Sequence, residues 1–178
     1  LAMTKLLTNY LNKSIDALKR LPLEDIETAI ETILATYAKN GTWFLAGNGG
    51  SAADAQHIAA EMVGRFVSDR KALAAISLSD NPSSVTAIAN DYGYDAVFSR
   101  QIEALAKPND VFLAISTSGH SANVIQAVKA AKAIGMSTLA LTGRDGGELS
   151  SLVDVSIVIP VQETALIQQA HITVGHML

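Results

Sequence analysis

The sequence has no cysteine among its 178 residues, which excludes disulfide bonds and metal sites built from thiolates. It has no run of basic residues and a net charge of -4, so a surface for nucleic acid is not expected. No apolar run approaches the ~18 residues of a membrane-spanning helix, and the first residues lack the apolar core of a secretory signal. We therefore expect a cytoplasmic protein that binds neither nucleic acid nor a membrane.

Linkers, internal repeats and low-complexity segments are also missing. Apolar residues make up 49% of the chain and charged residues 17%, which is the composition of a globular protein. We expect a single domain over residues 1–178, in which residues 1–40 form N-terminal helices and residues 41–178 form the body.

Two amphipathic helices are predicted before residue 41. Apolar residues at helical spacing run from Leu7 to Leu18, and a second stripe runs from Leu23 to Tyr37 after Pro22. Asn40 and Gly41 end the second helix. Both helices are additional to a minimal α/β domain and must bury their apolar faces, so we expect an assembly larger than a monomer.

Short apolar runs then alternate with helical patterns, which is typical of a parallel sheet covered by helices on both faces. In such sheets ligands bind beyond the carboxyl ends of the strands, so the turns that follow strands are the candidate sites. The predicted strands are residues 42–46, 74–79, 111–116, 137–142 and 155–159, and the predicted helices are residues 51–66, 83–90, 97–105, 121–134 and 164–178.

Two of these turns have the composition of a phosphate site. The first is G-N-G-G-S (residues 47–51), whose glycines allow a ligand close to the backbone at a helix start. The second is S-T-S-G-H-S (residues 116–121), which places four hydroxyls beside a helix start. Hydroxyls and amides together bind phosphate without lysine or arginine, although serine and threonine at such places also serve as helix caps.

A dinucleotide site is the rival interpretation of the first turn. Residues 47–52 match G-x-G-x-x-A after a strand, and Asp80 follows the next strand, where a ribose-binding acid is found. That interpretation leaves the second, hydroxyl-rich turn unexplained.

The helix after the first turn carries His57 and Glu61, which share one face because they are four residues apart. An imidazole and a carboxylate near a phosphate site can act as acid, base or metal ligands, whereas an exposed pair of this kind contributes little. The last helix carries Gln168, His171 and His176 among apolar residues. One such histidine is usually a satisfied core residue, but three polar groups together indicate a site.

These motifs, together with A-N-D-Y-G-Y, F-S-R-Q-I, L-T-G-R-D-G-G and I-Q-Q-A-H-I-T-V-G-H, resemble those of the phosphoheptose isomerases in the sugar isomerase (SIS) domain superfamily. The resemblance extends in order from about residue 41 to the end of the chain. It implies a three-layer α/β/α sandwich with a flavodoxin-like, five-stranded parallel sheet, N-terminal helices that build a homotetramer, and a phosphorylated heptulose as substrate.

The resemblance also implies residue roles. Glu61 and His176 match the catalytic glutamate and histidine, and His57, Glu61, Gln168 and His176 match the zinc ligands of some members. The implied substrate-binding residues are Asn48, Gly49, Gly50, Ser51, Arg65, Asn90, Asp91, Ser116, Thr117, Ser118, Ser121 and Gln168.

The chain departs from the family at His120, where asparagine is common, and at Leu166 and Gln169, where arginine and glutamate are frequent. The implied reaction is the conversion of sedoheptulose 7-phosphate to heptose 7-phosphate for bacterial surface heptose. The alternative function is a non-catalytic SIS protein that binds the replication initiator or senses sugar phosphates.

Overall fold

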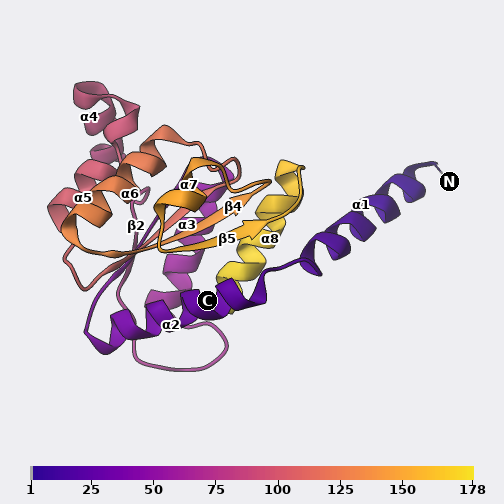
Figure 1. Cartoon of the computed structure of the whole chain (residues 1–178), viewed down its shortest axis with the longest axis horizontal. Helices are drawn as coiled ribbons and strands as arrows, with labels where there is room; N and C mark the ends of the chain where they lie inside the picture. The colour runs from indigo at the N-terminus through magenta and orange to yellow at the C-terminus, as the bar shows by residue number, and fades with distance from the viewer. Residues whose placement is uncertain (1) are drawn as a thin grey trace.

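The centre of the protein is a five-stranded sheet in the order β2-β1-β3-β4-β5, seen in a computed structural model that describes residues 2–178 (Figure 1). Every neighbouring pair of strands is parallel. This is the flavodoxin-like order, so the predicted fold class is confirmed. The strands are β1 (Trp43–Gly47), β2 (Ala75–Ser77), β3 (Val111–Ser116), β4 (Ser137–Gly143) and β5 (Val155–Ile159).

Helices cover both faces of the sheet, because successive side chains of a strand point to opposite faces. Trp43 and Leu45 of β1 belong to a core with α2, α3 and α8, whereas Phe44 and Ala46 belong to a second core with α5, α6 and α7. Both sets of β1 side chains are fully buried or nearly so, which explains the continuous apolar strands. The helices are α1 (Ala2–Leu18), α2 (Leu23–Ala38), α3 (Gly50–Val63), α4 (Pro82–Tyr92), η1 (Tyr94–Ala96, a 3-10 turn), α5 (Ser99–Leu105), α6 (Ala122–Ile134), α7 (Gly147–Leu152) and α8 (Thr164–Met177).

The largest differences between the predicted and the observed elements are at α7, η1, β2 and α3. Helix α7 and the turn η1 were not predicted, because six or three residues are too few to show a helical period. Strand β2 is three residues long rather than six, since it lies at the sheet edge and pairs only with β1. Helix α3 stops at Val63 instead of continuing to Phe66.

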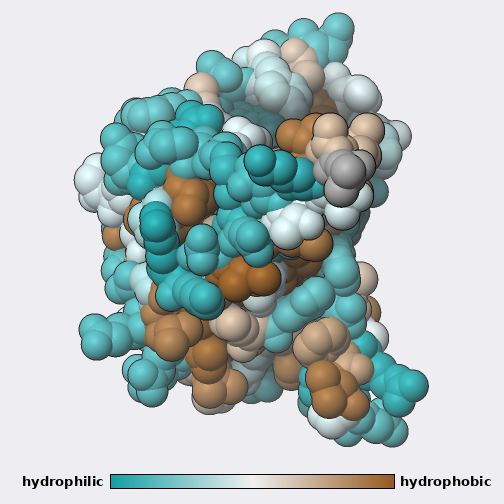
Figure 2. Space-filling view, turned by 90° about the vertical axis from the view of Figure 1, so that its right-hand side faces the viewer, coloured by the Kyte–Doolittle hydropathy of each residue, from teal (hydrophilic) through white to brown (hydrophobic). Residues whose placement is uncertain are grey.

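The two N-terminal helices have different surroundings. Helix α2 buries Ile26 and Ile33 in the core against the sheet. Helix α1 projects from the body and buries only Ser14 and Ala17, although its apolar stripe includes Leu11, which is 59% exposed (Figure 1). Figure 2 shows hydrophobic groups at the surface on the side of the molecule from which α1 projects.

The loops after β1 and β3 lie side by side at the carboxyl ends of the strands. Gly47 pairs with Ile115 in the parallel register, so Asn48 and Ser116 are the next residues of adjacent strands. The strand order reverses between these two strands, which is the switch point where such sheets bind ligands. Within residues 2–178, no helix has the length and apolar character needed to cross a membrane.

Candidate active site

The loop after β1 requires glycine at two positions for different reasons. Gly49 has a φ of +56°, a conformation that side chains disfavour. A Cβ on Gly50 would lie 2.6 Å from Nε2 of Gln168, so the α8 side chain reaches the backbone of α3 only because that position is bare. Ser51 is buried in the first turn of α3. The structure therefore brings the predicted residues of the first loop together with Gln168.

The loop after β3 contains linked hydroxyls that do not cap its helix. Oγ of Ser116 and Oγ of Ser121 lie 2.9 Å apart, and the amide of Gly119 donates to Oγ of Ser116. The amide of His120 donates to Oγ of Ser118. Ser121 precedes α6 but makes no side-chain capping bond. The capping interpretation of the Ser121 hydroxyl is therefore wrong, and the loop presents several hydroxyls at the carboxyl edge of the sheet.

An amide pair joins the loop after β1 to the first turn of α6. Asn48 and Asn123 donate to each other's side-chain oxygens at 2.8 and 2.9 Å, and the hydroxyl of Tyr94 donates to Oδ1 of Asn48 at 3.0 Å. Asn123 is only 2% exposed. Neither Asn123 nor Tyr94 was predicted as a site residue. The one signal for Asn123 is its position, two residues after the last hydroxyl of the second turn.

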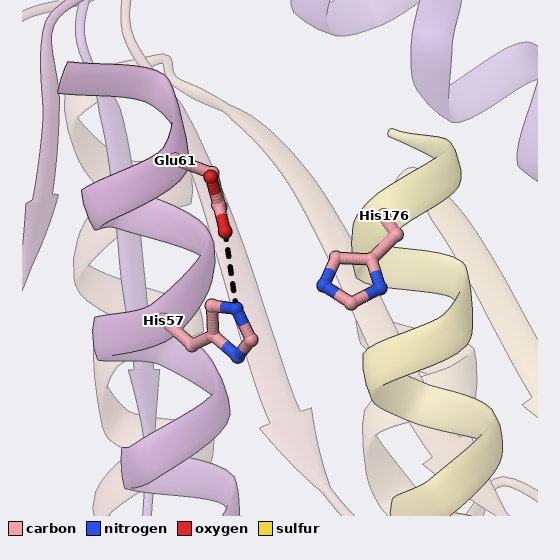
Figure 3. Close-up of side chains that lie close together, drawn as sticks. All are labelled: His57, Glu61 and His176. Carbon is pink, nitrogen blue, oxygen red and sulfur yellow. Dashed lines mark hydrogen bonds and ion pairs between the residues drawn. The ribbon is translucent and has the colours of Figure 1, made fainter. Parts of the chain in front are cut away.

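A second group of polar side chains lies between α3 and α8. Nε2 of His57 is 3.2 Å from Oε1 of Glu61, which confirms the pairing that the four-residue spacing predicted. His176 faces this pair from α8, with its ring centroid 5.1 Å from that of His57 (Figure 3). One ligand atom from each of the three residues falls within 4.8 Å of the others.

This group matches the donor set of a catalytic zinc site, in which three protein ligands leave a position open. Two imidazoles and a carboxylate are suitable ligands, and the three side chains are close enough to bind one ion after small adjustments. Gln168 contacts Gly50, seven residues or about 10 Å along the axis of α3 before His57. Its role as a fourth ligand stays a prediction.

Two further residues border the group and were missed in the sequence. The ring of Phe66 stacks on that of His176 with centroids 5.1 Å apart, and it comes from the segment after α3. Asp54 lies one turn before His57, and its Oδ2 is buried without a hydrogen-bond partner among the described residues. Burial raises the pKa of Asp54, and the nearby His57 partly opposes that increase. The signal for Asp54 was its three-residue spacing from His57 on one helical face.

His171 does not belong to this group. It is fully buried, and its Nε2 is 3.0 Å from the backbone oxygen of Thr142 on β4. Burial lowers the pKa of His171 to about 4, so the ring is neutral at pH 7. Of the three polar residues on the last helix, His171 is the core residue. Its Nε2 ties α8 to the sheet, whereas its Nδ1 is buried without a hydrogen-bond partner among the described residues.

The remaining predicted residues lie on the surface. Arg65 is exposed directly after α3. Asn90 and Asp91 are exposed near the end of α4, where Nδ2 of Asn90 donates to Oδ1 of Asp91. Of the departures from the family pattern, Leu166 is buried, whereas His120 and Gln169 are exposed. The roles of these residues in binding stay predictions.

Comparison with known proteins gives a consistent result. The profile of the SIS domain matches residues 8–143. A probable phosphoheptose isomerase of Thermoplasma acidophilum is 51% identical over 95% of this chain and 93% of its own length. A phosphoheptose isomerase of Helicobacter pylori is 48% identical over 94% of this chain and 85% of its own. The solved phosphoheptose isomerase of Neisseria gonorrhoeae has a TM-score of 0.92 at 44% identity, covering 98% of this chain and 95% of that one.

Proposed function

The chain belongs to the SIS-domain family and, within it, to the phosphoheptose isomerases, and from this premise we propose how its residues perform the reaction. The proposed reaction converts sedoheptulose 7-phosphate to D-glycero-D-manno-heptose 7-phosphate in heptose biosynthesis. The observation that carries the assignment of residues is the convergence of Glu61 and His176 from two helices on one point (Figure 3).

An aldose–ketose isomerisation moves one proton between two adjacent carbons through an enediol. In the proposed mechanism, the carboxylate of Glu61 removes the proton from the carbon next to the ketone and later returns it to the former carbonyl carbon. His176 donates a proton to the carbonyl oxygen and recovers one from the neighbouring hydroxyl. The side chain of Glu61 is 29% exposed, so substrate can reach it.

The loop after β3 is proposed to hold the phosphate. Hydroxyls of Ser116, Thr117, Ser118 and Ser121 supply donors without a fixed positive charge, which suits a protein of net charge -4. The loop after β1 is proposed to bind the sugar through Asn48 and Ser51, with Gln168 beside it. Binding energy from the phosphate then orients the reacting carbons.

We also propose that a zinc ion binds to His57, Glu61 and His176. Gln168 is proposed as the fourth ligand, and its side chain, which now lies against Gly50, would have to turn towards this group to bind the ion. When bound, the ion would polarise oxygens of the sugar next to the reacting carbons. Glu61 serves as ligand and base, and His176 as ligand and proton donor, only if their coordination is loose. The proposed proton transfers use neither His57 nor Gln168, and of these two only His57 belongs to the observed group of three, so its removal separates metal binding from acid–base chemistry.

The proposed assembly is a cytoplasmic homotetramer. Helix α1 has 17 residues but buries only Ser14 and Ala17, whereas most of the stability of a helix in a protein comes from packing its apolar face. Its apolar residues Leu7, Leu11 and Ile15 are at least half exposed in a single chain. Copies of the same chain would cover this stripe. A monomer in light scattering at micromolar concentration would rule the assembly out.

The function is tested with an assay for conversion of sedoheptulose 7-phosphate. We expect turnover by the wild type and a loss of about 100-fold or more for Glu61→Gln, the range for removal of a general base. Glu103→Gln is the matched control, because Glu103 is exposed on α5, away from α3 and α8. Binding of the sugar phosphate without turnover by the wild type would instead support the sensor alternative.

A further inference from the structure

The orientation of the Asn48 side chain follows from one backbone amide. The amide N–H of Val124 can only donate, and it points at Asn123 from 2.9 Å, so the Asn123 atom facing it is the oxygen Oδ1. Asn48 then donates from Nδ2 to this oxygen and accepts from Nδ2 of Asn123. Each amide of the pair has therefore only one possible orientation.

These hydrogen bonds leave one N–H group of the Asn48 side chain without a partner among the described residues. Its Oδ1 accepts from both Asn123 and Tyr94, which uses both lone pairs. One of the two N–H groups of its Nδ2 is bonded to Asn123, so the second N–H remains. Asn48 also lines a hollow of about 230 Å³ together with Gly49 and Tyr94. A ligand at this loop therefore meets a hydrogen-bond donor.

We propose that Asn123 and Tyr94 are positioning residues that hold the Asn48 amide so that its free N–H meets an acceptor oxygen of the bound sugar phosphate. This inference rests on the proposed function of the first loop. A freely rotating amide would present its oxygen as often as its N–H, whereas a fixed one is ready for one partner. Asn123 suits this task because it is 2% exposed, so water cannot replace its bonds.

The most direct variant is Asn123→Asp, which keeps the size and the acceptor for the Val124 amide. The ionised carboxylate places an oxygen against Oδ1 of Asn48, and this repulsion turns the Asn48 amide away. We expect KM to rise about tenfold at pH 8 with kcat changed less than about threefold, the effect of one misdirected hydrogen bond.

A pH series distinguishes positioning from a structural role. In the Asn123→Asp variant, the introduced carboxyl would, once protonated, donate an O–H to Oδ1 of Asn48 and so restore the original pair. The kcat/KM of this variant relative to the wild type should therefore rise as the pH falls from about 8 to about 5.5. The titratable group bonded within this network is the phenol of Tyr94, which a second variant removes. A ratio that is lowered equally at every pH would overturn the proposal.

Tyr94→Phe tests the other donor without touching α6. It should raise KM about threefold, and Tyr92→Phe is its matched control, because Tyr92 is exposed and forms no side-chain hydrogen bond among the described residues. If Asn123→Asp does not fold, as judged by circular dichroism, this pair of variants decides. Equal KM values for Tyr94→Phe and Tyr92→Phe would then refute the positioning of Asn48.

A double-mutant cycle gives the final test. In the Asn48→Ala background, Asn123→Asp should cause no further loss, because the group that it positions has gone. A further loss as large as in the wild type would contradict the inference. If the wild type lacks turnover, the isomerase proposal fails. The same cycle is then measured as binding of sedoheptulose 7-phosphate by calorimetry, where coupling between Asn48 and Asn123 supports the inference and additivity overturns it.

Discussion

His171 should make the stability of this protein sensitive to mild acid. The ring is fully buried, and burial lowers its pKa from 6.5 to about 4. The unfolded chain therefore binds a proton near pH 6.5 that the folded chain takes up only near pH 4. Stability contributed by the neutral ring is complete above pH 6.5 and is lost as the pH falls towards 4.

The size of this effect follows from the two pKa values. Each tenfold difference in proton affinity is worth ~1.4 kcal/mol. The shift of the His171 pKa from 6.5 to about 4 therefore lowers the free energy of unfolding by ~3 kcal/mol once the pH is below both values. At pH 5 the unfolded state is already largely protonated and the folded state is not, which gives a loss of ~2 kcal/mol relative to pH 8. That is a large part of the stability of an ordinary domain.

The assay is urea unfolding followed by circular dichroism at about pH 8, 6.5 and 5. The protein concentration is fixed because the unfolding of the proposed assembly would depend on it. His171→Gln is the informative variant, because glutamine can still donate to the Thr142 carbonyl but does not titrate. The carboxyls of Asp54 and Asp154 are present in both proteins, so their contributions cancel in the comparison.

We expect His171→Gln to be less stable than the wild type at pH 8 and to lose much less stability on acidification. The difference in free energy of unfolding between the wild type and His171→Gln should shrink by ~2 kcal/mol between pH 8 and pH 5. His120→Gln, which replaces an exposed histidine, should keep the wild-type dependence on pH. Equal slopes for His171→Gln and the wild type would refute the reasoning that a neutral buried imidazole causes the acid sensitivity.

Three other predictions concern the candidate site. Replacing Ser116 and Thr117 together with alanine should raise KM for the phosphorylated sugar by at least about tenfold, because two donors to the phosphate are lost; an unchanged KM would remove this assignment. Elemental analysis of protein purified without chelator should find zinc, and His57→Ala should lack it while keeping the wild-type circular dichroism spectrum; full activity of metal-free protein would limit His57 to a supporting role. Phe66→Ala should lower kcat/KM about threefold to tenfold by freeing the His176 ring, and unchanged kinetics would show that their stacking has no role in the reaction.

The strands, and the position of the site loops at their carboxyl ends, could be predicted because the sequence patterns that indicate them are local. A buried parallel strand reads as a continuous apolar run, and both faces of β1 are indeed in the core. The pairing of His57 with Glu61 follows from the geometry of one helix and needs no tertiary information. The meeting of His176 with this pair is different, because spacing within α8 says nothing about which helix lies beside it. That contact was implied by the resemblance alone.

The site residues that were not predicted make their contacts across elements. Asn123 and Tyr94 are separated from Asn48 by 75 and 46 positions, and neither stands in a pattern that indicates the partner. His171 and His176 show the same limit within one helix. Both are polar residues in an apolar context, yet one is buried against β4 and the other is exposed beside α3, and only packing decides between them.

The N-terminal helices show what an apolar stripe specifies and what it leaves open. The stripes of α1 and α2 have the same period, and each requires that a face be buried. For α2 the partner is the sheet of the same chain, which buries Ile33 to 2% exposure, whereas Leu7 of α1 stays 61% exposed. Because α1 buries only Ser14 and Ala17 against its own chain, we expect its apolar stripe to pack against another molecule, as in the proposed assembly. Replacing Leu7 and Leu11 with glutamate should therefore weaken the assembly in light scattering while leaving the sandwich folded, and an unchanged assembly would place the interface elsewhere.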